Sequence, residues 1–106
     1  MTIETIPPFD KSFKRLSKKY PSLKKDLQKL NASLLDNPTQ GKSLGDNCYK
    51  IRMAIASKSK GKSGGARVIT CVRIVADKIH LLDIFDKSDM ENIDDEYLSE
   101  LRNIVE

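Results

Sequence analysis

The sequence lacks several residue types on which common kinds of site chemistry depend. Tryptophan is absent, histidine occurs only as His80, and the two cysteines form no CxxC pattern. Zinc sites and histidine-based nucleophilic catalysis therefore have almost no residues from which to be built. Walker A and GxGxxG motifs are also missing, so nothing indicates a nucleotide cofactor. We expect no metal site and no small-molecule cofactor.

Long apolar runs and signal-like segments are missing as well. No stretch approaches the roughly 20 apolar residues of a membrane helix, and residues 1–8 have neither a basic start nor an apolar middle. Cys48 and Cys71 each fall in an apolar strand pattern, which favours buried thiols in a reducing compartment over a disulfide. With 106 residues, we expect one cytoplasmic domain, residues 1–106, with no membrane partner.

Acidic residues are scarce until the end of the chain. Residues 1–87 hold 18 of the 19 Lys and Arg against 8 acids, whereas residues 88–106 hold Arg102 alone against 7 acids. The densest basic run is residues 58–67, where four cations and three glycines share ten residues. Because this run contains no apolar side chain larger than alanine, it predicts a loop that binds a polyanion or is simply solvated.

Hydrophobic periodicity predicts the order β-α-α-β-β-β-α. Residues 2–6 form a short strand, after which Pro7-Pro8 opens a helix and Pro21 separates it from a second one that ends at Asn37-Pro38. The second helix has a clean apolar stripe at Leu23, Leu27, Leu30 and Leu34. The two helices form a hairpin with one apolar and one strongly basic side.

The period changes to two after the glycines at 41 and 45. Tyr49, Ile51 and Met53 alternate with Lys50 and Arg52, which predicts a strand with one core face and one cationic face. Residues 67–75 and 79–85 read as two further strands, joined as an antiparallel meander. The pattern Ser88-x-x-Glu91 predicts a capping box at the start of an amphipathic C-terminal helix.

Cations dominate the residues that could carry chemistry. His80 alternates with apolar strand residues and reads as a structural side chain with a satisfied ring nitrogen, and Asp83 and Asp86 are not spaced to share one strand face. Neighbouring polar strand faces meet on one surface, where strand and loop cations would form a phosphate-binding groove. A solvated charged face is the alternative. Such a groove suffices for RNA cleavage, in which a 2′-hydroxyl attacks the adjacent phosphate and a lysine crowded by cations acts as base or acid.

The motifs resemble those of a known family. The element order, Tyr49-Lys-Ile-Arg52, the glycine-rich block 60–69 and Leu81-Leu-Asp-Ile-Phe-Asp-Lys-Ser-Asp89 are similar to the RelE/ParE superfamily of type II toxin–antitoxin toxins, most closely its RelE/HigB-like branch. The resemblance implies an α+β, microbial-ribonuclease-like fold, with an N-terminal helical hairpin packed on an antiparallel sheet.

The resemblance also implies an activity, partners and site residues. Such toxins are mRNA interferases that cleave mRNA on the ribosome and so inhibit translation, and a cognate antitoxin protein neutralises them. Arg67 then matches the arginine that contacts the scissile phosphate. The other implied catalytic residues are Lys58, Lys60 and Lys87, and the implied RNA-binding residues are Lys50, Arg52, Lys62 and Arg73. The chain departs from the family pattern in its terminal helix, where Tyr97 lies on the apolar stripe and no tyrosine takes the catalytic place.

Two other functions fit the same sequence. A ParE-like toxin would inhibit DNA gyrase without doing chemistry, and a non-toxic binding protein would use the basic surface only to receive an acidic partner segment. The position of the cations, on the predicted sheet and its loop, favours the RNA-cleaving reading. We expect Arg67 to face the groove, so that Arg67→Ala abolishes toxicity without disturbing the fold.

Overall fold

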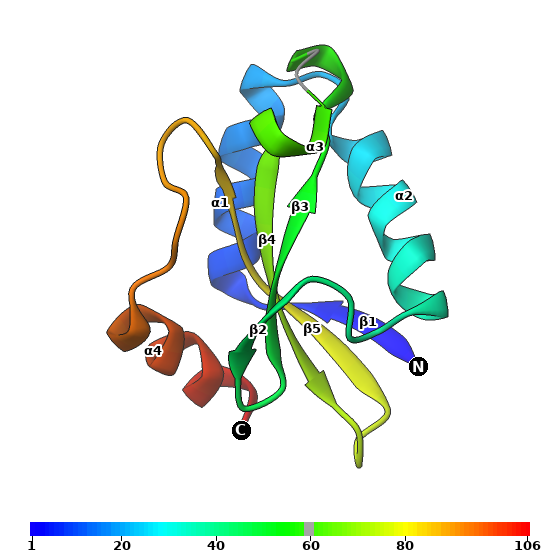
Figure 1. Cartoon of the computed structure of the whole chain (residues 1–106), viewed down its shortest axis with the longest axis vertical. Coiled ribbons are helices and arrows are strands. Elements are labelled where there is room, and N and C mark those ends of the chain that lie inside the picture. Colours follow the sequence, from blue (N-terminus) through cyan, green and yellow to red (C-terminus); the bar gives the residue numbers. More distant parts are fainter. Residues whose placement is uncertain (59–60) are drawn as a thin grey trace.

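The computed structural model describes residues 1–58 and 61–106, except for the side chain of residue 62. The strands are β1 (Thr2–Thr5), β2 (Lys42–Gly45), β3 (Cys48–Met53), β4 (Ala66–Arg73) and β5 (Lys78–Asp86). The helices are α1 (Pro7–Lys19), α2 (Leu23–Asp36), α3 (Gly61–Gly64) and α4 (Asp95–Val105), with a 3-10 turn at Ala56–Lys58. Figure 1 shows α1 behind the sheet, α2 at one side and α4 near the opposite side.

The five strands form one sheet in the order β1-β5-β4-β3-β2. β2 to β5 pair antiparallel, as the meander predicts, whereas β1 runs parallel to β5 with Ile3 opposite Ile79. The sheet is therefore mixed rather than wholly antiparallel. A parallel pair needs a long connection between its strands, and β1 and β5 are separated in the chain by both long helices and the other three strands.

The two faces of the sheet are covered by different helices. Asp86 at the end of β5 bonds to Tyr20 at the end of α1, while Asp83, three residues earlier, bonds to Tyr97 of α4. The side chains of a strand alternate between its faces, so α1 lies on one face and α4 on the other. β4 runs between them and is buried over Ala66–Val72. The apolar stripe of α2 packs inward as predicted, with Leu23 and Leu34 fully buried.

The α+β class and the predicted order of the main elements are confirmed, and three local features differ. No local pattern predicts β2 or the short helix α3. The C-terminal helix begins at Asp95, after the N-cap Asp94, and not at Ser88. Ser88 instead donates to the Asp86 carboxylate through both its backbone N–H and its hydroxyl.

The glycine-rich block approaches the protein's own backbone. A Cβ on Gly65 would lie 2.1 Å from the carbonyl oxygen of Met53 on the neighbouring strand. Only glycine fits there, because real side chains do not tolerate such a contact with backbone. Lys87 N–H also donates to the Gly65 carbonyl at 3.0 Å. This glycine thus joins the ends of β3, β4 and β5.

Cys48 and Cys71 are both buried and unbridged, and they lie directly opposite each other on β3 and β4. This agrees with the prediction of two buried thiols. Within the described part of the chain, no helix is both long and apolar enough to cross a membrane.

Candidate nucleic-acid interface

Strand pairing brings four cations to one face of the sheet. Lys50 and Arg52 share a face of β3 because they are two residues apart. Their partners across the ladder are Lys42 on β2 and Arg67 on β4. Like charges placed directly opposite each other destabilise a sheet. The exposed pair of Lys42 and Lys50 is therefore consistent with a surface that receives a ligand of opposite charge.

A groove of about 630 Å³ lies over this face. Its lining consists of Gln40, Gly41, Lys42, Lys50, Ile51, Arg52, Glu91 and Asn92, and we call it the cationic groove. The structure thus unites the predicted RNA-binding residues Lys50 and Arg52. It adds Lys42, which the sequence analysis missed because the short strand β2 has too few apolar residues to show a strand pattern.

Arg67 lies beneath this groove rather than facing it. Its side chain is 1% exposed, and its guanidinium donates to the carbonyl oxygens of Ala66 at 3.1 Å and Ser63 at 3.0 Å. It also lies 3.1 Å from the carboxylate of Glu91. The expectation of an arginine that faces the groove is therefore wrong: strand alternation gives the correct face, but the loop between β5 and α4 covers the side chain.

The loop between β5 and α4, residues 87–94, places two polar residues, Glu91 and Asn92, beside the cationic groove. Lys50 Nζ donates to the Asn92 side chain at 2.6 Å and to the Glu91 carbonyl oxygen at 3.3 Å. The Glu91 side chain is 41% exposed. Sequence reasoning placed Glu91 in a capping box, and its partner Arg67 lies 24 residues away, so no local pattern could connect them.

Lys58 belongs to a different cluster, on the face covered by α1. Its ammonium is 2.6 Å from the carboxylate of Asp86, which also accepts hydrogen bonds from Tyr20 at 2.5 Å and from Ser88. Burial acts to raise the pKa of Asp86, but the hydrogen bonds from Lys58, Ser88 and Tyr20 outweigh it and hold this pKa far below its usual range. Lys58 therefore serves as the partner of a buried carboxylate.

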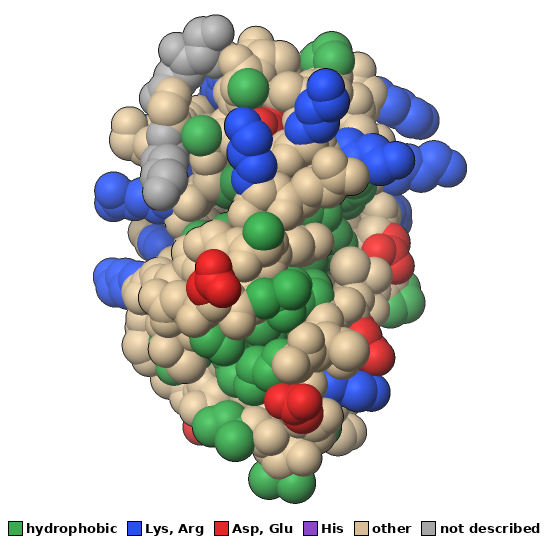
Figure 2. Space-filling model, turned by 90° about the vertical axis from the view of Figure 1, so that its right-hand side faces the viewer, with side chains coloured by type: hydrophobic (Ala, Val, Ile, Leu, Met, Phe, Trp, Pro, Cys, Tyr) green, Lys and Arg blue, Asp and Glu red, His purple; other side chains and the backbone are tan. Residues whose placement is uncertain are grey.

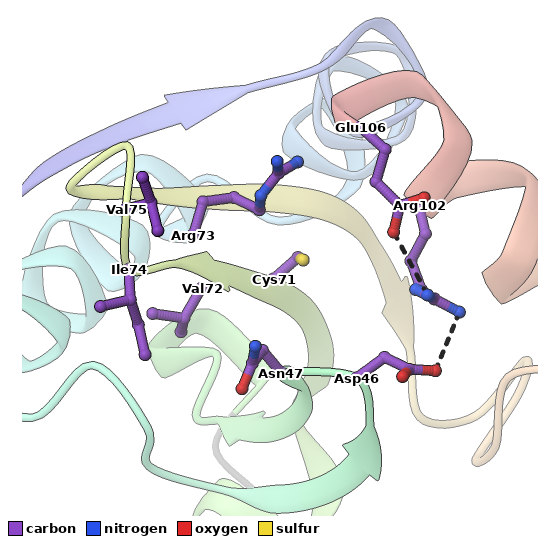
Figure 3. A pocket seen from close by; sticks show the side chains of 9 residues that line it. All are labelled: Asp46, Asn47, Cys71, Val72, Arg73, Ile74, Val75, Arg102 and Glu106. Carbon is purple, nitrogen blue, oxygen red and sulfur yellow. Dashed lines mark hydrogen bonds and ion pairs between the residues drawn. The ribbon is translucent and has the colours of Figure 1, made fainter.

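The remaining predicted site residues lie apart from the groove. Arg73 is at the far end of β4, where its guanidinium donates to the Val105 carbonyl oxygen. Figure 3 shows it in a second pocket, near Arg102, which pairs with Asp46 and Glu106. Lys87 is exposed in the turn after β5. Lys60 and the side chain of Lys62 lie outside the described residues, so their predicted roles stay predictions.

Neither His80 nor the other potential metal ligands among the described residues form a second candidate site. His80 is half-buried on β5 opposite Cys71, as expected of a strand residue, and its Nδ1 has no hydrogen-bond partner within the described residues. Burial lowers the pKa of this imidazole. Within residues 1–58 and 61–106, no group of three or more His, Cys, Asp or Glu is arranged to hold a metal ion.

Basic side chains also surround the helices. Figure 2 shows the face that carries α2, where Lys and Arg gather mainly over the upper half and hydrophobic side chains over the centre. The positive surface predicted for the helical hairpin is therefore present, in addition to the cationic groove.

Tyr97 is a packing residue of α4, as its place on the apolar stripe predicts. Its hydroxyl donates to the buried Asp83 carboxylate at 2.8 Å. Burial and this hydrogen bond raise the pKa of Tyr97 to about 12. We expect Tyr97→Phe to lower the free energy of unfolding by about 2 kcal/mol, since the hydrogen bond to a charged acceptor is lost.

Urea denaturation at pH 7 measures this change. A raised folded-state pKa stabilises the protein below the ordinary tyrosine pKa near 10, and the contribution disappears as pH rises toward 12. The difference between the wild type and Tyr97→Phe should therefore shrink between pH 10 and pH 12. Tyr49→Phe is the control, and an equal loss in both variants would contradict the assigned hydrogen bond.

Comparison with known proteins agrees with the motif resemblance. A family model described as the RelE toxin of the RelE/RelB toxin–antitoxin system matches residues 9–106. Among solved structures, a double arginine-to-alanine mutant of E. coli toxin RelE in the free state has a TM-score of 0.61 and 18% sequence identity, over 85% of this chain and 86% of that chain; at that identity the likeness concerns the fold. No match was found among the curated proteins. Because the family model spans nearly the whole sequence, this chain belongs to the RelE family of toxin–antitoxin toxins.

Proposed function

We propose that this toxin is an mRNA interferase that cleaves mRNA on the ribosome through attack of a 2′-hydroxyl on the adjacent phosphate. The observation that carries the proposal is the cationic groove, where Lys42, Lys50 and Arg52 line one cavity over the sheet. Phosphate contacts of this kind give sequence-independent affinity for a polynucleotide backbone. The RelE family membership supports the same function.

The groove supplies the fixed positive charge that cleavage of a phosphodiester bond requires. Negative charge grows on the phosphoryl oxygens in the transition state, and fixed cations stabilise it. Arg52 is exposed, while Lys50 is held in place by its hydrogen bond to Asn92. Lys50 and Arg52 therefore suit phosphate contact better than Arg67, which is buried under the loop.

A cognate antitoxin is the second partner that we propose. β1 and β2 are the two edges of the sheet, and an extended segment can pair with such an edge strand. Acidic residues on a segment paired with β2 would then meet the groove cations Lys42, Lys50 and Arg52. A complex that forms equally well at high salt, and without these cations, would contradict the electrostatic part.

Transcript 5′-end mapping after brief induction in a bacterium tests the proposed activity. We expect new ends inside translated frames for the wild type, and a loss of most of them for the double variant Lys42→Ala/Arg52→Ala. Lys24→Ala/Lys25→Ala removes the same charge from the exposed side of α2 and is the matched control. Growth arrest without new ends would overturn the interferase function and favour the gyrase-inhibiting alternative.

Salt dependence of binding gives an independent prediction for the groove. For single-stranded RNA, the slope of log K against log salt changes by about 0.7 for each phosphate contact. Removal of Lys42 and Arg52 should therefore flatten the slope by about 1.4 units, as measured with a fluorescent oligoribonucleotide. An unchanged slope in Lys42→Ala/Arg52→Ala would show that these side chains do not contact phosphate.

A further inference from the structure

We propose that Glu91 is the general base of the RNA cleavage, and that Arg67 positions this carboxylate instead of binding the scissile phosphate. The inference rests on the proposed interferase function. It starts from a contrast in exposure: the Arg67 side chain is 1% exposed, whereas Glu91, 3.1 Å from it, is 41% exposed. The exposed part of the Glu91 side chain borders the groove, whereas the guanidinium is buried, as is the Oε2 atom of Glu91 that lies against it.

Arg67 has the contacts of a residue that holds another in place. Its guanidinium donates to the carbonyl oxygens of Ser63 and Ala66, which fix its plane. The same guanidinium then contacts both carboxylate oxygens of Glu91, at 3.1 and 3.4 Å. Glu91 is tied at its backbone too, because its carbonyl oxygen accepts a hydrogen bond from Lys50 at 3.3 Å. The carboxylate is therefore held at a defined place beside the groove cations.

Other described groups are less suited to accept the proton. Glu91 is the one carboxylate in the described lining of the cationic groove. Asp86 is fully buried, lies toward α1 and is occupied by Tyr20, Lys58 and Ser88. Lys50 and Lys58 already donate hydrogen bonds as ammonium groups, and an ammonium has no lone pair with which to take a proton.

The step balances without any further reactant. Glu91 takes the proton of the 2′-hydroxyl while the 2′ oxygen forms a bond to phosphorus. The bond from phosphorus to the 5′ oxygen breaks, which leaves a 2′,3′-cyclic phosphate on one fragment. The departing 5′ oxygen takes a proton from the solvent and becomes a hydroxyl. Glu91 returns its proton to the solvent, so the protein is restored.

Glu91→Gln tests the base directly, since the amide keeps the shape of the side chain but accepts no proton. Single-turnover cleavage of a defined mRNA on programmed ribosomes should fall by about 10²–10⁴-fold, while binding of the same ribosomes stays within about threefold of wild type. Glu100→Gln, on the exposed side of α4, is the matched control and should cleave at the wild-type rate. Thermal unfolding verifies that each variant is folded.

Rescue by a conservative variant separates a positioning role for Arg67 from a purely structural one. Arg67→Met removes the guanidinium that contacts both carboxylate oxygens of Glu91, so the single-turnover cleavage rate should fall while ribosome binding stays near the wild-type value. Arg67→Lys keeps a cation at this place and should restore part of the rate without a change in binding. Wild-type cleavage by a folded Arg67→Met variant would contradict the positioning role.

Three outcomes would overturn the assignment. Wild-type cleavage with an equal rate in Glu91→Gln would remove the base role and leave the proposed function intact. Faster cleavage in Glu91→Gln would show that the carboxylate blocks the groove as a stand-in for phosphate. Absence of cleavage by the wild type, on ribosomes that a known interferase cleaves, would overturn the proposed function together with the role of Glu91.

Discussion

Arg67→Ala is expected to lower the free energy of unfolding by about 3 kcal/mol. The substitution removes a long, fully buried side chain, and large-to-small changes in a core cost about 2–5 kcal/mol. It also removes the guanidinium that donates to the carbonyl oxygens of Ser63 and Ala66, and a buried acceptor without its donor adds to the loss. Urea denaturation with a single transition measures the difference.

Arg52→Ala provides the comparison within the same ladder. Arg52 lies directly opposite Arg67 on β3 but is exposed, so its removal should change stability by less than about 0.5 kcal/mol. Equal denaturation midpoints for the two variants would contradict the burial of Arg67. The sequence-based expectation that Arg67→Ala leaves the fold intact gives way to an expected loss of stability, because the side chain is buried. A loss of toxicity in this variant would then follow from unfolding as well as from a lost phosphate contact.

Asp86→Asn is expected to destabilise the protein by about 3–5 kcal/mol. The carboxylate is fully buried and pairs with the Lys58 ammonium, whose side chain is 11% exposed. Removal of one partner of a buried ion pair leaves the other charge uncompensated, which accounts for losses of this size. Asp36→Asn, at the exposed end of α2, is the control and should have little effect.

The pH dependence gives the same pair a second test. The folded-state pKa of Asp86 is lowered, so its stabilising contribution is fully present above the ordinary aspartate pKa near 4. The contribution is lost as pH falls from about 4 toward the lower folded-state value. Wild type should therefore lose stability over this acid range more steeply than Asp86→Asn. Parallel curves would show that Asp86 is not held as a paired carboxylate.

The spacing of apolar residues predicts those helices and strands that pack against the core through one face. Leucines at helical spacing give α2, and the alternation around Ile51 gives β3 with its cationic face. β2 is a four-residue edge strand with one half-buried leucine, so its apolar residues are too few to show the alternation that predicts a strand. The parallel partner of β1 is chosen by contacts of high sequence separation, which no local pattern contains.

The candidate site was predictable only in part, for a related reason. Composition identifies a cationic surface, and strand alternation places Lys50 and Arg52 on it. Exposure, however, depends on what covers a strand. Arg67 stands on the same face of β4 as Ile69 and Cys71, which are buried, and the loop 87–94 closes over it. The contact with Glu91 follows from the path of that loop and from no spacing in the sequence.

The parallel pairing of β1 with β5 also has a consequence for biosynthesis. Residue 3 pairs with residue 79, and α1 packs on β5 as well, so β1 and α1 lack their partner strand until residues 78–86 have left the ribosome. Pairings over such long loops form slowly. The nascent toxin should therefore acquire its fold, and with it the cationic groove, only after β5 has been synthesised.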